Sequence, residues 1–198
     1  MHKFYFIALA SVLSFSMLCA ATQEADAQVF AGAQVRGGLG DYNEDGDTDM
    51  SFGFGLRGYA GYDLPMVGVG VNFDYGWYTT SKGGFDTTLS MPSAGLLVRV
   101  DPLPIVKFNV LANYIFGTFE MSGGSDELSV AGSQSIGGLL LGLEALYSIR
   151  IPPFKTYIEV GPYFHYHWVK GDDAPDNAEY VDFWAAGLAV QGHFQIGL

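Results

Sequence analysis

Apolar and polar residues alternate along most of this chain. From Val67 to Tyr78, every second residue is aliphatic or aromatic, and the residues between them are mostly glycine or polar. The same period of two recurs at 107–116, 157–168 and 184–196. Such alternation is typical of β-strands that present one apolar face. The pattern therefore predicts an all-β protein.

Breaks in the alternation divide residues 28–198 into eight predicted strands. The strands are expected at 28–40, 51–62, 66–80, 88–100, 105–119, 133–150, 155–169 and 181–197. Short breaks containing proline (63–65, 101–104, 151–154) alternate with longer polar ones (41–50, 81–86, 121–132, 171–179). This order is typical of an antiparallel meander, whose exposed edges disappear when it closes. We predict an eight-stranded antiparallel up-and-down β-barrel.

The two faces of these strands differ in a way that indicates the surroundings of the barrel. The apolar face carries no charge, and the other face is rich in Gly, Ser, Asn, Gln and Tyr with isolated charges. A soluble barrel or sandwich would need a charged exterior, whereas a membrane barrel turns its apolar face outward. Small polar residues suit a narrow lumen. We therefore predict a transmembrane β-barrel, with a soluble β-fold as the alternative.

Aromatic residues near the strand ends are consistent with this prediction. Two interfacial girdles are expected, one at each end of the barrel. The expected girdle residues are Trp77, Tyr78, Trp168 and Trp184 toward the long loops, and Tyr62 and Tyr147 toward the short turns.

Composition narrows the possible functions. Only 15% of the residues are charged, whereas a soluble domain has about a quarter. The net charge of −12 excludes a basic nucleic-acid binder. The 27 glycines fit a crowded lumen better than a water-facing surface.

The first 27 residues have the layout of a secretory signal peptide. A basic start at Met1–Lys3 precedes the apolar run Phe4–Ala21, and Ala25–Ala27 is a small-x-small cleavage site. An uncleaved anchor is the alternative. We expect cleavage after Ala27, so that residues 28–198 form the barrel. Cys19 is the only cysteine, so the exported chain is expected to fold without disulfides.

Taken together, the eight alternating segments of residues 28–198 resemble the small outer-membrane β-barrels of the OmpA and OmpX type. The resemblance implies a location in the cell outer membrane, short periplasmic turns and long surface loops. It also implies contact with outer-membrane lipids, lipopolysaccharide and the outer-membrane assembly machinery, and we expect a monomer. Such barrels often end in an aromatic residue, whereas this chain ends in Leu198.

Both signs of charge occur on the predicted inward face. Buried charges must be paired or hydrated, so we expect these residues to form a salt-bridged plug that closes the lumen. The alternative is a small ion-conducting path through rearranged pairs. The predicted lumen charges are Arg36, Arg57, Asp74, Arg99, Lys107, Glu144 and Glu159.

The first long loop contains half of a calcium-binding pattern. Alternate oxygen donors with a glycine at Gly46 match the start of an EF-hand-type loop, but Phe52 replaces the bidentate glutamate at the twelfth position. We expect at most weak Ca²⁺ binding, and no other cofactor. The candidate ligands are Asp41, Asn43, Asp45, Asp47 and Asp49.

A catalytic role has little support in the sequence. His165 and His167 share a face with Glu159, but no Gly-x-Ser-x-Gly motif is present, and Ser90 or Ser93 could only be neighbours in space. A metal site on the two histidines lacks an identifiable third ligand. We predict a non-catalytic protein with a structural, adhesive or recognition role through acidic surface loops and an unknown surface ligand. A small pore is the first alternative, and a lipid-modifying enzyme is the second.

Overall fold

The computed structural model describes residues 28–44, 47–64, 66–82, 85–125, 128–152, 155–171 and 181–197. The predicted signal peptide, residues 1–27, lies outside these ranges and stays a prediction. No helix among the described residues is long and apolar enough to cross a membrane. The strands are β1 (Gln28–Glu44), β2 (Asp47–Leu64), β3 (Val67–Lys82), β4 (Phe85–Leu103), β5 (Val106–Ser125), β6 (Leu128–Ile151), β7 (Thr156–Gly171) and β8 (Val181–Gly197).

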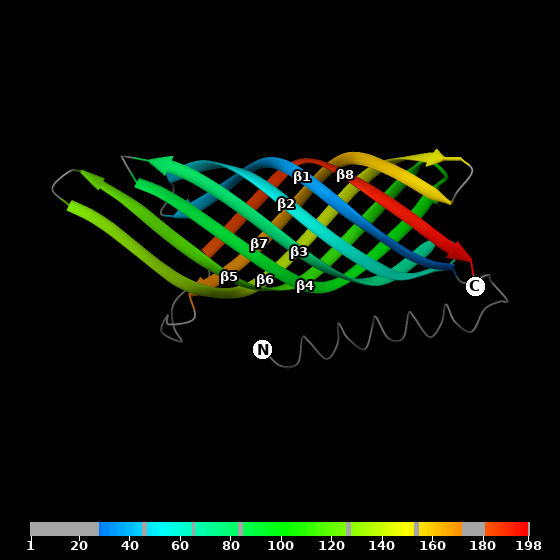
Figure 1. Ribbon diagram of the computed structural model, residues 1–198, viewed down its shortest axis with the longest axis horizontal. Helices are drawn as coiled ribbons and strands as arrows, with labels where there is room; N and C mark the ends of the chain where they lie inside the picture. The colour runs from blue at the N-terminus through cyan, green and yellow to red at the C-terminus, as the bar shows by residue number, and fades with distance from the viewer. Residues whose placement is uncertain are drawn as a thin grey trace.

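The eight strands form one closed antiparallel barrel in sequence order (Figure 1). Closure is made by β1 and β8, which pair from Gln28↔Gly197 to Tyr42↔Phe183. The strands are strongly tilted, and the C-terminus lies at the end that holds the short turns. The predicted all-β, eight-stranded up-and-down barrel is therefore confirmed.

The outer face of the barrel is apolar, and the buried charges lie inside it together with apolar and aromatic side chains. On β3, the outward side chains of Phe73 and Trp77 are 52% and 48% exposed, whereas Asp74, which follows Phe73, is 0% exposed. The alternation continues around the wall, since Leu188 on β8 is 63% exposed and Gln191 only 1%. The parity predicted from sequence therefore assigns the faces correctly.

Tyr78 is an exception among the predicted girdle residues. Its side chain is 2% exposed and packs edge-on against Phe183 inside the barrel, with ring centres 4.7 Å apart. Its neighbour Trp77 points outward, as strand alternation requires. Tyr78 therefore fills the lumen, and the prediction for this residue is wrong.

The strands extend farther toward the long-loop end than the sequence pattern predicts. Residues 41–44 and 47–50 are paired strand in β1 and β2, and the predicted loop at 121–132 is mostly strand in β5 and β6. Backbone pairing does not depend on side-chain polarity, so a hairpin can continue after its apolar face has ended. The loop boundaries predicted from polarity are therefore wrong at these hairpins.

Candidate functional site

The seven predicted lumen charges lie on seven successive strands, β1 to β7, and their side chains point into the barrel. Six of them are nearly or fully buried, and Lys107 is partly buried near the short-turn end. The structure brings these residues together in two groups along the barrel axis. The eighth strand, β8, contributes Gln191, which bonds to Gln34 and to Glu159 as described below.

The first group contains two arginines and two acids in the middle of the lumen. Arg36 makes two bonds to Asp74, at 2.6 Å from Nη1 and 2.5 Å from Nη2. Arg57 donates from Nε to Asp74 at 2.8 Å and from Nη1 to Glu144 at 2.6 Å. Arg57 therefore joins two carboxylates from strands that are not neighbours in the wall, β3 and β6.

The second group lies closer to the short turns. Arg99 makes a two-pronged ion pair with Glu159, with one bond of 2.9 Å, and a weaker contact of 3.2 Å with Asp101. Asp101 also accepts a bond of 2.7 Å from the Lys107 amine. This group connects β4, β5 and β7.

Two glutamines link the groups into one network. Gln34 on β1 donates to Glu144 at 3.0 Å and to Gln191 on β8 at 3.1 Å. Gln191 in turn donates to Glu159. Because every strand contributes at least one member, the network connects the whole circumference of the barrel. Its side chains fill the lumen with fixed pairs, which supports a structural plug.

Several members of the network were not identified from the sequence. Asp63 and Asp101 were assigned to the proline-containing turns, yet both continue the inward parity of β2 and β4. Asp63 accepts a bond of 2.6 Å from Gln195. Extending the alternation one residue into each turn would have found both carboxylates.

Above the network, toward the long-loop end, the lumen is aromatic. Tyr78, Tyr163 and Phe183 pack there beside two histidines, against glycines of nearby strands. At Gly38, for example, a Cβ atom would lie 2.7 Å from the Tyr163 hydroxyl. Glycines on β1 and β2 therefore leave the space that the large side chains of nearby strands occupy.

A serine hydrolase arrangement does not form among the described residues. His165 contacts Glu144 at 3.4 Å and Arg57 at 3.3 Å. Ser93 bonds instead to Asn113, and Ser90 lies beside Trp77 on the outer face. The histidines and the two candidate serines are therefore not arranged as nucleophile and base.

Most of the candidate calcium ligands cannot be described. Asp41 is buried in the barrel wall, at 6% exposure. The side chains of Asn43, Asp47 and Asp49 and the whole of Asp45 lie outside the described part of the chain. The calcium loop stays a prediction.

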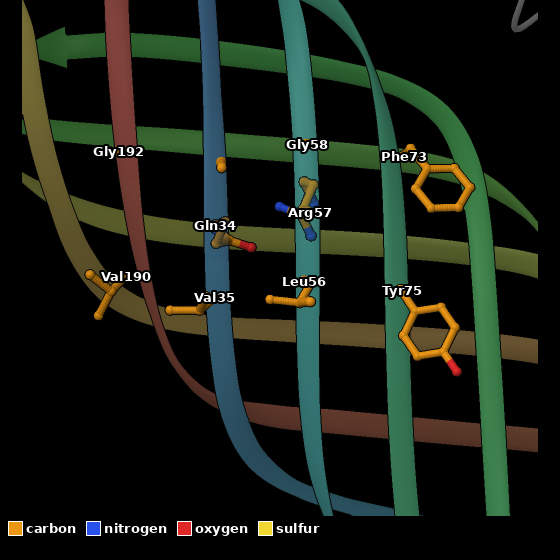
Figure 2. Close-up of a pocket in the computed structure, with 10 residues that line it drawn as sticks. Gln34, Val35, Leu56, Arg57, Gly58, Phe73, Tyr75, Val190 and Gly192 are labelled. Atoms are coloured by element: carbon orange, nitrogen blue, oxygen red, sulfur yellow. The ribbon is translucent and has the colours of Figure 1, made fainter.

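The outer wall carries a shallow apolar hollow over β8, β1, β2 and β3 (Figure 2). Its floor is a row of small residues in register, Gly192, Ala33 and Gly58. Val35, Leu56 and Val190 form the next row, as Figure 2 shows. A Cβ atom added at Gly58 or Gly192 would meet nothing within 4 Å, so this part of the wall is open.

The glycines of the hollow and of the lumen should therefore respond oppositely to alanine. Gly192→Ala should stabilise the barrel by about 0.4–1 kcal/mol, because it restricts the unfolded chain without a clash. Gly38→Ala should destabilise it by about 1–3 kcal/mol, because its Cβ would collide with the Ala186 carbonyl oxygen. Urea unfolding of both variants in lipid vesicles checks this, and shifts in the same direction would contradict it.

At the long-loop end, the strands β3 to β6 extend beyond the closed part of the barrel. β6 pairs with β7 only from Ile136 onward, but with β5 as far as Leu128. β4 and β3 support β5 on its other side. The β5–β6 hairpin reaches farthest in this direction, at the left of Figure 1. We call the segment Leu128–Ser135 the β6 edge, because within the described residues it pairs on one side only.

Comparison with known proteins agrees with this architecture. Residues 10–151 match the family described as outer membrane protein beta-barrel domain. Among curated proteins, no significant match is found.

Solved structures with the same fold are distant in sequence. Ail, the attachment invasion locus protein of Yersinia pestis, solved with the heparin analogue sucrose octasulfate, is 17% identical with a TM-score of 0.51, covering 82% of this chain and 98% of its own. A major outer membrane protein from Thermus thermophilus is 18% identical with a TM-score of 0.51, covering 86% and 99%. At such identities the likeness concerns the fold alone.

Proposed function

The chain belongs to the outer membrane protein beta-barrel domain family, and on this premise we propose that it is a non-catalytic surface-recognition protein. In this proposal the barrel is a closed, monomeric frame in the outer membrane, exported by the signal peptide at residues 1–27. The β6 edge binds an extended segment of a partner at the cell surface. The one-sided pairing of the β6 edge among the described residues is the observation that carries the proposal.

The outer faces of β5 and β6 indicate where the lipid ends. Phe116 pairs with Gly137 at the last apolar level, and the next outward pair is Thr118 with Ser135. Beyond that pair, the outward side chains of Glu120 and Ser133 are exposed and polar. The β6 edge therefore begins where the apolar band stops, in a position that water and other proteins can reach.

The sequence of the β6 edge favours strand pairing. Residues 128–135 read Leu-Ser-Val-Ala-Gly-Ser-Gln-Ser, without proline or charge. Natural proteins protect exposed edges with charged residues, proline or bulges. An unprotected edge can accept a further strand through its free main-chain groups, and this is a common mode of peptide recognition.

The register shows which main-chain groups of the β6 edge point away from β5. At the other end of β6, Ser148 N donates to the Ile105 carbonyl of the β5 side. The β5–β6 register is continuous from Val106↔Tyr147 to Ser125↔Leu128. The main-chain groups of even-numbered β6 residues therefore bond to β5. Odd-numbered residues such as Ser133 point their N–H and C=O away from β5.

Other observations agree with surface recognition. The candidate loops are acidic, with Asp172, Asp173 and Asp176 in the last one, so a cationic or neutral partner is favoured over a polyanion. The solved complex of Ail contains a heparin analogue, which is a property of that protein. The paired charges in the lumen support a closed frame rather than the alternative pore.

Replacing Ser133 with proline should weaken the binding of an added strand without unfolding the barrel. Ser133→Pro removes an N–H that faces the open edge and keeps the bonds to β5. We expect binding of a fluorescent nine-residue peptide of alternating Thr and Val to weaken at least about tenfold. Fluorescence anisotropy with barrels in lipid vesicles measures this, and unchanged heat-modifiable gel migration verifies folding.

Ser133→Ala is the matched control, since it removes the same hydroxyl and keeps the N–H. It should bind the peptide like the unaltered chain. Equal binding by Ser133→Pro, or an equal loss in Ser133→Ala, would show that the β6 edge does not bind through its backbone. Absence of peptide binding by the unaltered chain would reject strand addition.

A further inference from the structure

Two histidines of β7 lie together in the aromatic part of the lumen. His165 and His167 both point inward, are 0% and 1% exposed, and have ring centres 6.1 Å apart. Tyr78 and Phe183 pack on His167, with ring centres 6.2 and 5.3 Å from it. The pair therefore lies in a closed pocket of aromatic rings above the ion-pair network.

Most nitrogens of this pair have no protein partner. Among the described residues, none bonds to His165 Nδ1 or to either ring nitrogen of His167. A buried polar group without a partner costs about 1–3 kcal/mol. Such groups need an explanation, of which an ordered water or an ion is the usual one.

Glu144 orients His165 in the way that outer carboxylates orient metal-binding histidines. Its Oε1 lies 3.4 Å from His165 Nε2. Arg57 Nη2 lies 3.3 Å from the same nitrogen, while Nε and Nη1 of its guanidinium donate to Asp74 and Glu144. In the tautomer whose Nε2–H donates to Glu144, Nδ1 keeps its lone pair and has no partner among the described residues, which is the arrangement of carboxylate–histidine–metal sites.

We propose that His165 Nδ1 and one ring nitrogen of His167 bind a divalent transition-metal ion of the zinc, nickel or copper class. These ions prefer imidazole ligands. With a metal–nitrogen bond of about 2.1 Å, two imidazoles that share an ion have ring centres no more than about 6.5 Å apart. The observed 6.1 Å lies within this limit.

The remaining coordination positions are left to water. Among the described residues, no three His, Cys, Asp or Glu side chains converge on one point. The positive charges of Arg36 and Arg57 are balanced by Asp74 and Glu144, so the pocket does not repel a cation strongly. Two imidazoles make an open site, which holds its ion more weakly than a closed structural site.

Copper binding to the full chain in detergent micelles tests the proposal, because Cu²⁺ reports bound nitrogen in its paramagnetic resonance spectrum. The ion is added both before and after folding, so that access through a closed lumen does not limit the result. We expect nitrogen coupling in the unaltered chain and at least a tenfold loss of affinity in His167→Phe. A phenyl ring occupies similar space and removes both nitrogens.

His193→Gln is the matched control, because His193 is a buried lumen histidine that contacts Arg99 and Tyr59 nearer the short turns. It should bind Cu²⁺ unchanged, and Zn²⁺ should raise the unfolding midpoint of this variant but not of His167→Phe. His165→Gln provides a second test if His167→Phe fails to show heat-modifiable migration. Nitrogen coupling that persists without His167 or His165, or none in the unaltered chain, would mean that only water occupies the pocket, and would overturn the proposal.

Discussion

Replacing Arg57 with methionine should lower the free energy of unfolding by about 3–5 kcal/mol, because it removes one partner from a buried ion-pair network. Arg57 bridges Asp74 and Glu144 at 2.8 and 2.6 Å, and all three side chains are at most 1% exposed. Without the guanidinium, Glu144 keeps only bonds to neutral groups. Urea unfolding in lipid vesicles, followed by tryptophan fluorescence, measures the loss.

Lys107→Met is the control for this prediction. Its amine pairs with Asp101 near the short turns, where the carboxylate side chain is 22% exposed. Because water can replace the lost partner, the change should cost no more than about 1 kcal/mol. Equal losses in the two variants would show that the central network has no special stabilising role. A double variant that combines Arg57→Met with Glu144→Gln tests the coupling of this ion pair. Its loss in the free energy of unfolding should differ by about 0.5–3 kcal/mol from the sum of the two single losses.

Leu188→Arg should destabilise the barrel by about 2–4 kcal/mol, the cost of an arginine on the lipid face near the middle of a bilayer. Leu188 is 63% exposed, and it lies near the centre of β8. In a protein whose outer face met water, the same change would be nearly neutral. Vesicle unfolding and the fraction of protein with heat-modifiable migration both measure the effect.

Ser133→Arg is the matched control, because Ser133 also points outward but lies above the apolar band on β6. It should change stability by no more than about 0.5 kcal/mol, as surface substitutions usually do. A neutral result at Leu188 would contradict the assignment of the outer face to lipid. A large loss of stability at both positions would mean that the lipid-facing apolar band extends farther toward the long loops than the change from Phe116 to Thr118 indicates.

The faces of the strands could be predicted from sequence because the period of two is a local property. One charged residue such as Asp74, set between Phe73 and Tyr75, is enough to assign the direction of its neighbours. The pairing partners could not be predicted in this way. That Arg57 meets Glu144, 87 positions later, depends on the tilt and closure of the barrel.

The ends of the strands were also beyond the sequence pattern. Polarity indicates where the apolar band stops, near Thr118 and Ser135, but pairing continues to Ser125 and Leu128. The same limit hid Asp63 and Asp101, which look like turn residues beside proline. In both cases the backbone follows the ladder, and side-chain chemistry alone does not report it.

The spacing of the lumen charges has a consequence for how the barrel forms. Arg36 and Arg57 both pair with Asp74 on β3, but Arg57 and Arg99 also pair with glutamates on β6 and β7. In a partial sheet of β1 to β4, Arg57 keeps Asp74 and Arg99 keeps only the longer contact of 3.2 Å with Asp101. Arginines without their buried glutamate partners cannot enter a lipid interior cheaply. The pairing is complete only when the last strands close the wall, so insertion and closure are expected to occur as one cooperative event, without a stable half-barrel in the membrane.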